Sequence, residues 1–425
     1  MTGPEAGGDT VPGRLRIVAL ADTDSYVKWA GHLLGSVAAV SDVHLLIVET
    51  ALVVSAAQQA AALAGSGLDP LRVRRITYDG LAGELERLAP DAVLAAARGP
   101  VVRVLIAAVA ALEPRPVIVS GLPGISIPPT TAAMVHRTQC DLFVLHSTRE
   151  VAAFSELARR RGLAHRFALA GLPFARSGAS ATVHDPTSTD LVFASQAIVP
   201  RERADRVRVA RLLVRAARAH PERRVVVKER AVAGEHQTHA QKHGYPDLLR
   251  SFAPLPPNLV VSTDSMASAL DAAEGLVTVS STAAIEAIAR GIPVIALDTF
   301  GVDDALINTV FVGSGLLGGE GDVIARVFRA PSERWKAENY FHEPAAEDWF
   351  AQVGRLVALR RAGELPAKPG RIRRGGRVRD VWERRLALGR RDRSLAGTLV
   401  WIVGVPARAV LGPLLRPVFR RRLAG

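Results

Sequence analysis

The segment of residues 275–298, GLVTVSSTAAIEAIARGIPVIALD, constrains the fold of this chain more than any other part of it. The segment reads as a buried strand at Leu276–Val279, a hydroxyl-rich turn, a short helix at Ser281–Arg290 and a second buried strand at Val294–Leu297. Two apolar strands joined by one helix are typical of a parallel βα unit. The segment therefore predicts an α/β protein with parallel sheets.

The turn before the predicted helix has the composition of an anion site. Ser280, Ser281 and Thr282 bring hydroxyl groups to the place where the first backbone N–H groups of a helix lack partners. The helix dipole favours a negative charge there, and Glu286 returns to nearly the same helix face as Thr282. Because ligands of open parallel sheets bind outside the carboxyl ends of strands, these residues are candidates to bind a phosphate. A plain helix cap is an equally ordinary use of the same residues.

The sequence of residues 279–295, VSSTAAIEAIARGIPVI, resembles the nucleotide-binding signature of GT-B glycosyltransferases that build bacterial capsule and other envelope polysaccharides. In that signature a Ser-Thr pair opens the helix and a Gly-x-Pro-Val ends the unit. The likeness extends over the body of the chain and is closest to an uncharacterised actinobacterial glycosyltransferase family. It implies two Rossmann-like domains that face each other across a cleft, with a nucleotide-sugar donor as substrate and no cofactor.

Apolar runs alternate with helical patterns along most of the chain, as in parallel sheets covered by helices on both faces. The pattern predicts a flexible leader at 1–13, an N-terminal Rossmann-like domain at 14–170, a linker at 171–188, a C-terminal Rossmann-like domain at 189–365 and a basic tail at 366–425. The resemblance implies that the first domain is the acceptor domain and the second the nucleotide-sugar domain. The predicted strands are Leu15–Leu20, Val43–Val48, Val73–Ile76, Ala92–Ala95, Val117–Val119, Leu142–Leu145, Asp190–Ala194, Val225–Lys228, Leu259–Val261, Leu276–Val279 and Val294–Leu297. The predicted helices include Tyr26–Val40, Arg149–Arg161, Glu202–Ala219 and Glu347–Arg361.

The excess positive charge of the chain lies in its tail. Of the 54 Lys and Arg and the 41 Asp and Glu, residues 366–425 hold 16 and 3, which leaves 38 of each sign in the body. The apolar stretch Leu395–Leu415 is interrupted by prolines and an arginine, so it suits a membrane interface better than a spanning helix. We therefore expect residues 371–422 to contact an anionic membrane surface, with packing on the body as the alternative. Nucleic acid is not an expected partner, because the tail lacks interleaved aromatic residues and any known motif.

The remaining composition points to a reducing compartment. Cys140 is the single cysteine, so an intramolecular disulfide is excluded. The amino terminus, MTGPEAGGDT, has no basic segment followed by an apolar one, as a signal peptide would have. Together with the basic tail, these features predict a cytoplasmic protein that is peripheral at the inner face of the plasma membrane.

Cationic residues follow a second strand of the C-terminal domain. Lys228 and Arg230 end the apolar strand at 225–228 and can counter the charge of a diphosphate at the same sheet edge. The related polysaccharide enzymes have a Lys-x-His-Pro element here, which implies a catalytic role for His236, although this chain lacks the proline. A charged loop without a ligand is the alternative. His236, His239 and His243 also have a spacing compatible with zinc, but no cysteine lies near them, and no metal is predicted.

The first strand of the chain ends in carboxylates. Asp22 and Asp24 are candidates for the general base that takes a proton from an acceptor hydroxyl, and helix capping by Asp24 is the alternative. The Asp-Thr-Asp triplet also matches the metal-binding Asp-x-Asp of GT-A transferases. The nucleotide signature of the second half favours the GT-B interpretation without a metal.

Other sheet edges of the N-terminal domain carry candidates for binding the acceptor or the transferred sugar. Lys28 lies in the helix after the first strand, and Arg98 follows the strand at 92–95. Gly121 and Gly124 belong to a glycine-proline loop whose backbone amides can cradle a ligand, or which is simply a structural turn.

These observations predict a metal-independent glycosyltransferase that moves a sugar from a nucleotide-activated donor to a cell-envelope polysaccharide or a lipid-linked acceptor. Ser281, Thr282, Lys228 and Arg230 would bind the diphosphate, and Glu286 the ribose. A sugar-nucleotide epimerase of the same architecture and a non-catalytic envelope protein that binds a nucleotide or glycan are the alternatives.

Overall fold

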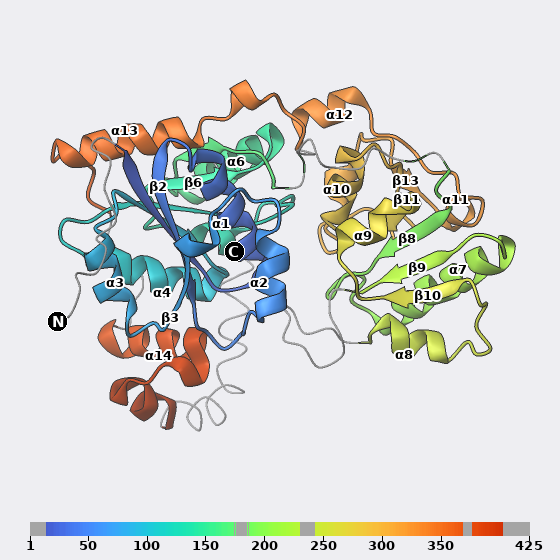
Figure 1. The fold of residues 1–425 in the computed structure, drawn as a ribbon, viewed down its shortest axis with the longest axis horizontal. Coiled ribbons are helices and arrows are strands. Elements are labelled where there is room, and N and C mark those ends of the chain that lie inside the picture. Colours follow the sequence, from blue (N-terminus) through green and yellow to red (C-terminus); the bar gives the residue numbers. More distant parts are fainter. Residues whose placement is uncertain are drawn as a thin grey trace, which may run out of the picture.

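Two parallel sheets, each covered by helices, form the body of the molecule (Figure 1). The structure is a computed structural model that describes residues 14–173, 175, 185, 187–229, 243–368 and 376–402. Within these residues the N-terminal sheet has seven strands in the order β3-β2-β1-β4-β5-β6-β7, and the C-terminal sheet has six in the order β10-β9-β8-β11-β12-β13. This architecture confirms the predicted fold class of two Rossmann-like α/β domains. We call the two sheets with their helices the N-terminal and the C-terminal domain.

The strands are short, apolar and largely buried, as expected of parallel sheets that are covered on both faces. The N-terminal sheet comprises β1 (Leu15–Ala21), β2 (Ser41–Val48), β3 (Val73–Ile76), β4 (Ala92–Ala96), β5 (Val117–Gly121), β6 (Leu142–Leu145) and β7 (Phe167–Leu169). The C-terminal sheet comprises β8 (Asp190–Ala194), β9 (Val225–Lys228), β10 (Leu259–Ser262), β11 (Ala273–Thr278), β12 (Val294–Leu297) and β13 (Leu317–Gly318).

Helices connect the strands and pack on both faces of each sheet. The N-terminal domain has α1 (Asp24–Val37), α2 (Ala56–Leu63), α3 (Leu81–Leu88), α4 (Gly99–Val109), α5 (Thr131–Val135) and α6 (Thr148–Arg161). The C-terminal domain has α7 (Arg203–Ala219), α8 (Tyr245–Arg250), α9 (Met266–Asp271), α10 (Ala283–Ala289), α11 (Glu320–Ile324) and α12 (Glu333–Glu338). Two further helices follow, α13 (Trp349–Arg361) and α14 (Gly376–Leu388). Short 3-10 turns lie at Pro70–Arg72, Thr309–Phe311, Pro344–Ala346 and Gly389–Arg391.

The strand order of each sheet reverses at its first strand. β1 pairs with β2 on one side and with β4 on the other, and β8 pairs in the same way with β9 and β11. The connections on the two sides of such a point run to opposite faces of the sheet, which opens a crevice at the carboxyl ends of the strands. Each domain therefore has one position where a ligand is favoured by topology alone.

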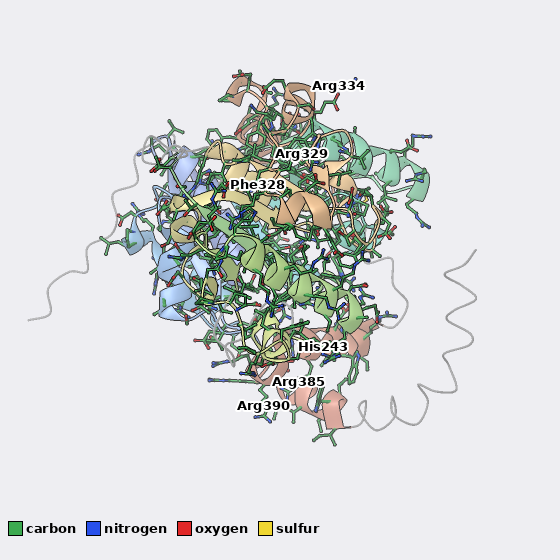
Figure 2. The ribbon with its side chains drawn as sticks, turned by 90° about the vertical axis from the view of Figure 1, so that its right-hand side faces the viewer. His243, Phe328, Arg329, Arg334, Arg385 and Arg390 are labelled. Atoms are coloured by element: carbon green, nitrogen blue, oxygen red, sulfur yellow. The ribbon has the colours of Figure 1, made fainter. Side chains whose placement is uncertain are left out.

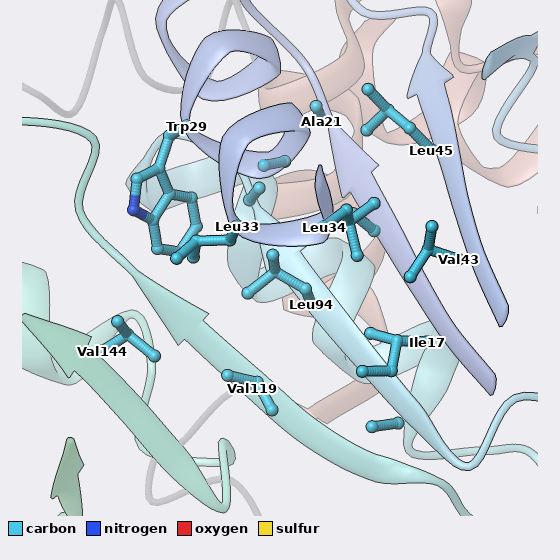
Figure 3. Close-up of a cluster of buried hydrophobic side chains, with 14 of the residues drawn as sticks. Ile17, Ala21, Trp29, Leu33, Leu34, Val43, Leu45, Leu94, Val119 and Val144 are labelled. Atoms are coloured by element: carbon cyan, nitrogen blue, oxygen red, sulfur yellow. The ribbon is translucent and has the colours of Figure 1, made fainter. Parts of the chain in front are cut away.

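Helix α1 anchors the core on one face of the N-terminal sheet (Figure 3). Its buried side chains Trp29, Leu33 and Leu34 lie over apolar residues of β1, β2, β4, β5 and β6. Burying a side chain of this size stabilises the fold by about 1.5–3 kcal/mol. The packing fixes the start of α1, and with it the candidate residues there, relative to the sheet.

The chain returns to the N-terminal domain after the C-terminal sheet. Helix α13 packs on β5, β6 and β7, and its Trp349, Val353 and Leu356 are part of the same core as Trp29. Helix α14 packs on α4, and Figure 1 shows it at the opposite side of the domain from α13. Part of the tail thus packs on the body, which is the alternative that the sequence left open. None of the helices within the described residues is long and apolar enough to cross a membrane.

Several predicted elements end differently in the structure. β11 begins at Ala273 and runs through Gly275, which the sequence predicts as the boundary of the strand. A glycine is needed at position 275 inside this strand, because a Cβ there would come within 2.3 Å of the ring of Phe328. The strands β7 and β13 were not predicted, since runs of three and two residues carry too little periodicity to be recognised. In the predicted linker, Leu172 is fully buried in the core of the C-terminal domain.

The close packing of α1 gives a testable prediction about stability. A Cβ at Gly35 would lie 1.7 Å from the backbone oxygen of Ser66, so Gly35→Ala must displace α1 or the chain at 66–68. We expect this substitution to lower the free energy of unfolding by about 2–4 kcal/mol. Gly83→Ala is the matched control, because nothing lies within 4 Å of its Cβ. In helix α3 it should raise the stability by about 0.5–1 kcal/mol in the same denaturant titration.

Candidate functional site

The crevice of the N-terminal sheet is occupied by an ion pair. Asp22 follows β1 and Arg98 follows β4, and the Arg98 backbone N–H and Nε donate to the two Asp22 carboxylate oxygens at 3.2 and 3.0 Å. Asp22 is fully buried, and burial raises the pKa of its carboxyl to about 6 against the opposing effect of Arg98. The structure thus brings both residues together at the predicted sheet edge. There the Asp22 carboxylate and the Arg98 guanidinium bind each other.

A second buried cation supports the same crevice. Arg137 donates to the Tyr26 hydroxyl oxygen at 2.9 Å and to the Ser120 hydroxyl oxygen at 3.0 Å, and its charge also favours the ionised form of Asp22. No sequence pattern points to Arg137, because spacing does not distinguish a buried arginine from a surface one. Asp24, in contrast, stands half-buried in the first turn of α1. Of the two predicted bases, Asp24 is the more exposed.

The crevice of the C-terminal sheet holds an amide instead of an ion pair. Gln196 follows β8 and contacts Ser280, which follows β11. The Gln196 side-chain oxygen accepts from the Ser280 backbone N–H at 2.8 Å, and its amide nitrogen donates to the Ser280 hydroxyl at 3.0 Å. Ser280 is buried and already bonded, so a ligand would reach it only by displacing Gln196.

The remaining hydroxyls of the turn differ in role. Ser281 caps the helix, because its hydroxyl accepts from the Ala283 backbone N–H at 3.2 Å. Thr282 is partly exposed at the start of α10, beside the glycine loop of the other domain. α10 spans seven residues and is buried on one face, while Glu286 projects from its first turn. The structure therefore assigns capping to Ser281 and leaves Thr282 at the surface of the turn.

Lys228 ends β9 inside the protein. Its side chain is buried, and its ammonium group donates to the backbone oxygen of Glu229. The Glu229 carboxylate in turn accepts from the Ser195 hydroxyl at 2.8 Å. Arg230, His236 and His239 lie outside the described residues. The polar residues that the sequence did not reveal at this edge are Ser195, Gln196 and Glu229, which follow strands but carry no recognisable motif.

The two domains meet at the start of α10. The Lys28 ammonium of α1 lies 3.9 Å from the Glu286 carboxylate of α10, and a Cβ at Gly124 would lie 3.0 Å from the Thr282 hydroxyl. Four predicted residues from two domains thus come together at one place. The Lys28–Glu286 pair is long and partly exposed, so it contributes less than about 1 kcal/mol and is readily exchanged for another partner.

Gly121 allows close packing of neighbouring residues, whereas the sequence suggests that its backbone amide binds a ligand. A Cβ at this residue would come within 2.5 Å of the Trp29 indole and 2.6 Å of the Val144 carbonyl. His146, at the next strand end, is fully buried, with its ring nitrogen 2.8 Å from the Trp29 indole nitrogen. Burial lowers the pKa of His146 to about 4, so this imidazole is neutral at physiological pH. These residues hold α1 against β5 and β6.

A buried carboxylate joins the glycine loop to the C-terminal part of the chain. Glu150 of α6 accepts from the Ser126 and His146 backbone N–H groups at 2.7 and 2.9 Å and from the Tyr340 hydroxyl at 2.7 Å. Burial raises the pKa of Glu150 to about 6, and the three donors oppose that shift. Arg149 of the same helix donates to the carbonyls of Val310 and Thr309 at 2.9 and 3.0 Å. The start of α6 therefore fixes how the two domains meet.

Metal ligands are not grouped in the described part of the chain, where no three His, Cys, Asp or Glu side chains are placed to hold one ion. Within the Asp-Thr-Asp triplet, the Asp22 carboxylate is directed to Arg98. Lys28 and Glu286 carry charge at the start of α10, where the Glu286 carboxylate also accepts from Arg290 at 3.3 Å, and Arg149 carries charge at the other contact between the domains.

Fold and site together define a class of protein, in which two parallel α/β domains bring the carboxyl edges of their strands to a shared boundary, the GT-B plan. The family described as "Putative glycosyltransferase (DUF6716)" matches residues 17–356. The chain belongs to this family. No curated protein matches the sequence.

Three solved structures illustrate the likeness of the fold. A "putative UDP-N-acetylglucosamine 2-epimerase" from Listeria monocytogenes has a TM-score of 0.55 at 11% identity, covering 85% of this chain and 100% of that one. UDP-GlcNAc 2-epimerase from Methanocaldococcus jannaschii, solved with UDP-GlcNAc and UDP, has a TM-score of 0.53 at 12% identity, with 80% and 99% covered. MnaA from S. aureus, solved with UDP, has a TM-score of 0.50 at 12% identity, with 84% and 99% covered. At such identities the likeness is one of fold alone.

The pairing of buried Asp22 with the half-buried Arg98 gives a prediction about pH. The folded pKa of Asp22 lies above its usual value of 3.8, so burying the carboxylate costs stability as the pH rises through about 6. Arg98→Leu removes the partner and should raise that pKa further. We expect the variant to lose about 2–4 kcal/mol of unfolding free energy near pH 8 and clearly less near pH 5.

Arg159→Leu is the control for this measurement, since Arg159 and Glu156 form an exposed pair on α6. It should cost less than about 0.5 kcal/mol at either pH in denaturant titrations. Equal losses for Arg98→Leu at both pH values would mean that the charge of Asp22 does not control the stability of this crevice.

Proposed function

We propose that the protein transfers a sugar from a nucleotide-activated donor to a cell-envelope glycan or a lipid-linked acceptor, without a metal ion. The observation that supports this proposal most directly is the approach of α1 to α10, where Lys28 lies 3.9 Å from Glu286. A donor held by the start of α10 would have its sugar next to the first turn of α1. That geometry suits a reaction between substrates bound by different domains.

The donor nucleotide lies against the C-terminal domain in this proposal. Glu286 accepts hydrogen bonds from the ribose hydroxyls, and its exchangeable contact with Lys28 is given up when the donor binds. Thr282 and the ammonium group of Lys28 then face the diphosphate, which needs donors for the charge that develops on the leaving group. Lys228, the last residue of β9, and Arg230, which lies outside the described residues, are the further cations proposed for the diphosphate.

Asp24 acts as the general base on the acceptor hydroxyl. It is half-buried in the first turn of α1, whereas Asp22 is fully buried and held by Arg98. A base must come within hydrogen-bond reach of the proton that it removes, and the greater exposure of Asp24 favours it over Asp22 for this role. His236 remains a proposed participant of the same site from the C-terminal domain.

A sugar-nucleotide epimerase is the second candidate, because the three solved structures with the same fold include two proteins named as UDP-N-acetylglucosamine 2-epimerases. Incubation with a panel of sugar nucleotides separates the candidates. A transferase yields free nucleoside diphosphate, an epimerase yields an isomeric sugar nucleotide, and a non-catalytic protein shows binding alone.

Substitutions at the boundary test the transferase directly. Glu286→Gln should weaken binding of the sugar nucleotide about tenfold, because a charged hydrogen bond to ribose is lost. Asp24→Asn should leave that affinity unchanged and lower kcat about 100-fold or more, as expected for loss of a general base. Calorimetry measures the first effect and release of nucleoside diphosphate the second.

Asp247→Asn is the matched control, because this exposed carboxylate pairs with Arg250 within α8, whereas Lys28 and Glu286 belong to α1 and α10. It should keep both affinity and rate within about twofold of the unchanged protein. Full activity of Asp24→Asn would exclude this residue as the base, and unchanged affinity of Glu286→Gln would exclude the proposed position of the ribose.

A further inference from the structure

The described end of the tail is a pair of helical segments attached to the N-terminal domain. Helix α14 is followed by a 3-10 turn at Gly389–Arg391 and by a helical segment at 395–402, whose Trp401 ring stacks on Trp382 of α14 at 5.9 Å between centroids. The second segment therefore runs back along the first. We call residues 376–402 the C-terminal hairpin.

The C-terminal hairpin is held firmly on the body. Glu383 pairs with Arg103 of α4 at 2.7 Å, and Arg391 pairs with Glu49 at the end of β2 at 2.8 Å. Ala387 and Leu388 are buried in the core between α14 and the N-terminal sheet. Because these contacts involve the N-terminal domain alone, the hairpin has a fixed orientation relative to the edge where Asp24 lies.

The outer face of the hairpin is apolar and exposed. Leu395, Leu399 and Ile402 are 84%, 65% and 62% exposed, and Trp401 is 39% exposed. Val378 and Leu386 of α14 are exposed on the same hairpin. Single exposed apolar residues are ordinary, but a group of six within one short hairpin marks an interaction surface.

Arginines surround this apolar face. Arg377, Arg379, Arg390, Arg391 and Arg393 are exposed, and Arg385 lies over the Trp401 ring at 5.8 Å. Figure 2 shows Arg385 and Arg390 together at one end of the molecule, opposite the end that carries Arg334. The hairpin holds seven arginines and three acidic residues, of which Glu383 pairs with Arg103 and Arg379 and buried Asp392 with Arg384, while Arg391 pairs with Glu49 of the body. The surface therefore presents net positive charge beside exposed apolar side chains.

We propose that the C-terminal hairpin lies in the surface of an anionic phospholipid bilayer and holds the N-terminal domain against it. Leucine and tryptophan side chains enter the boundary between head groups and acyl chains, while the arginines contact anionic head groups. A membrane-embedded acceptor then reaches Asp24 from the bilayer, a consequence that rests on the proposed function. Nucleic acid would use the arginines but would leave the aliphatic side chains in water.

Vesicle binding by the full-length protein tests the surface. We expect cosedimentation with vesicles that contain about 30% phosphatidylglycerol, weaker binding at high salt, and little binding to neutral vesicles. Leu395→Asp/Leu399→Asp should weaken binding at least tenfold, because it places charge in the apolar boundary. Leu71→Asp is the matched control, since Leu71 is 86% exposed on the body, and it should bind normally.

The tryptophans provide a second measurement. Trp29, Trp335 and Trp349 are buried in the body, so brominated lipids should quench mainly Trp382 and Trp401. The Trp401→Phe variant should lose most of this quenching while still cosedimenting. Unchanged vesicle binding by the double aspartate variant, or salt-sensitive binding to duplex nucleic acid that exceeds vesicle binding, would overturn the proposed partner.

Single-cysteine labelling tests the orientation. Cys140 is buried, so an environment-sensitive dye can be attached selectively at Val378→Cys on the hairpin or at Val261→Cys on β10 of the C-terminal domain. A blue shift on vesicle addition is expected at 378 alone, and an equal shift at both positions would contradict the orientation. Sugar-nucleotide binding, measured on the same variants without vesicles, should be unchanged. Loss of that binding in every protein, with vesicle binding intact, would reject the proposed function and leave the membrane surface standing.

Discussion

The reversal of strand order in each sheet is the constraint on which the site depends. At β1 and β4 the resulting crevice is filled by buried Asp22 and its partner Arg98, and at β8 and β11 by Gln196 and Ser280. A buried carboxylate is tolerated only when a cation and hydrogen-bond donors compensate for its lost hydration. Asp22 therefore stabilises the sheet edge, and the proposed ligand chemistry falls to Asp24 and Thr282, each two residues further along the chain.

A second constraint fixes how the two edges face each other. Glu150 binds the glycine loop, the end of β6 and Tyr340, so one buried carboxylate joins the N-terminal domain to the chain that returns from the C-terminal domain. Helix α13 then completes the core of the first sheet. Because Gly124 and Thr282 approach through this junction, its rigidity determines the separation between the proposed base and the proposed donor position.

The sequence predicts the fold well and the site only in part, for a physical reason. Strands such as Leu142–Leu145 and Val294–Leu297 match the structure residue for residue, since continuous apolar runs between turns are a local signal. The pairing of Asp22 with Arg98 joins residues that are distant in the chain, and no periodicity encodes it. Glu150 reads as an ordinary helix residue, although it is fully buried and accepts hydrogen bonds from three segments.

The tail shows the same division between what is local and what is not. Counting charges locates the positive excess after residue 365, but it does not reveal that α14 docks on α4 through Arg103 and Glu383. That docking determines the direction in which the positive charge faces. Arginines on an unattached segment would attract an anionic surface in any orientation, whereas arginines on a docked hairpin turn one domain toward it. Under the proposed function and orientation, membrane attachment and access of the acceptor both belong to the N-terminal domain, on which the hairpin docks.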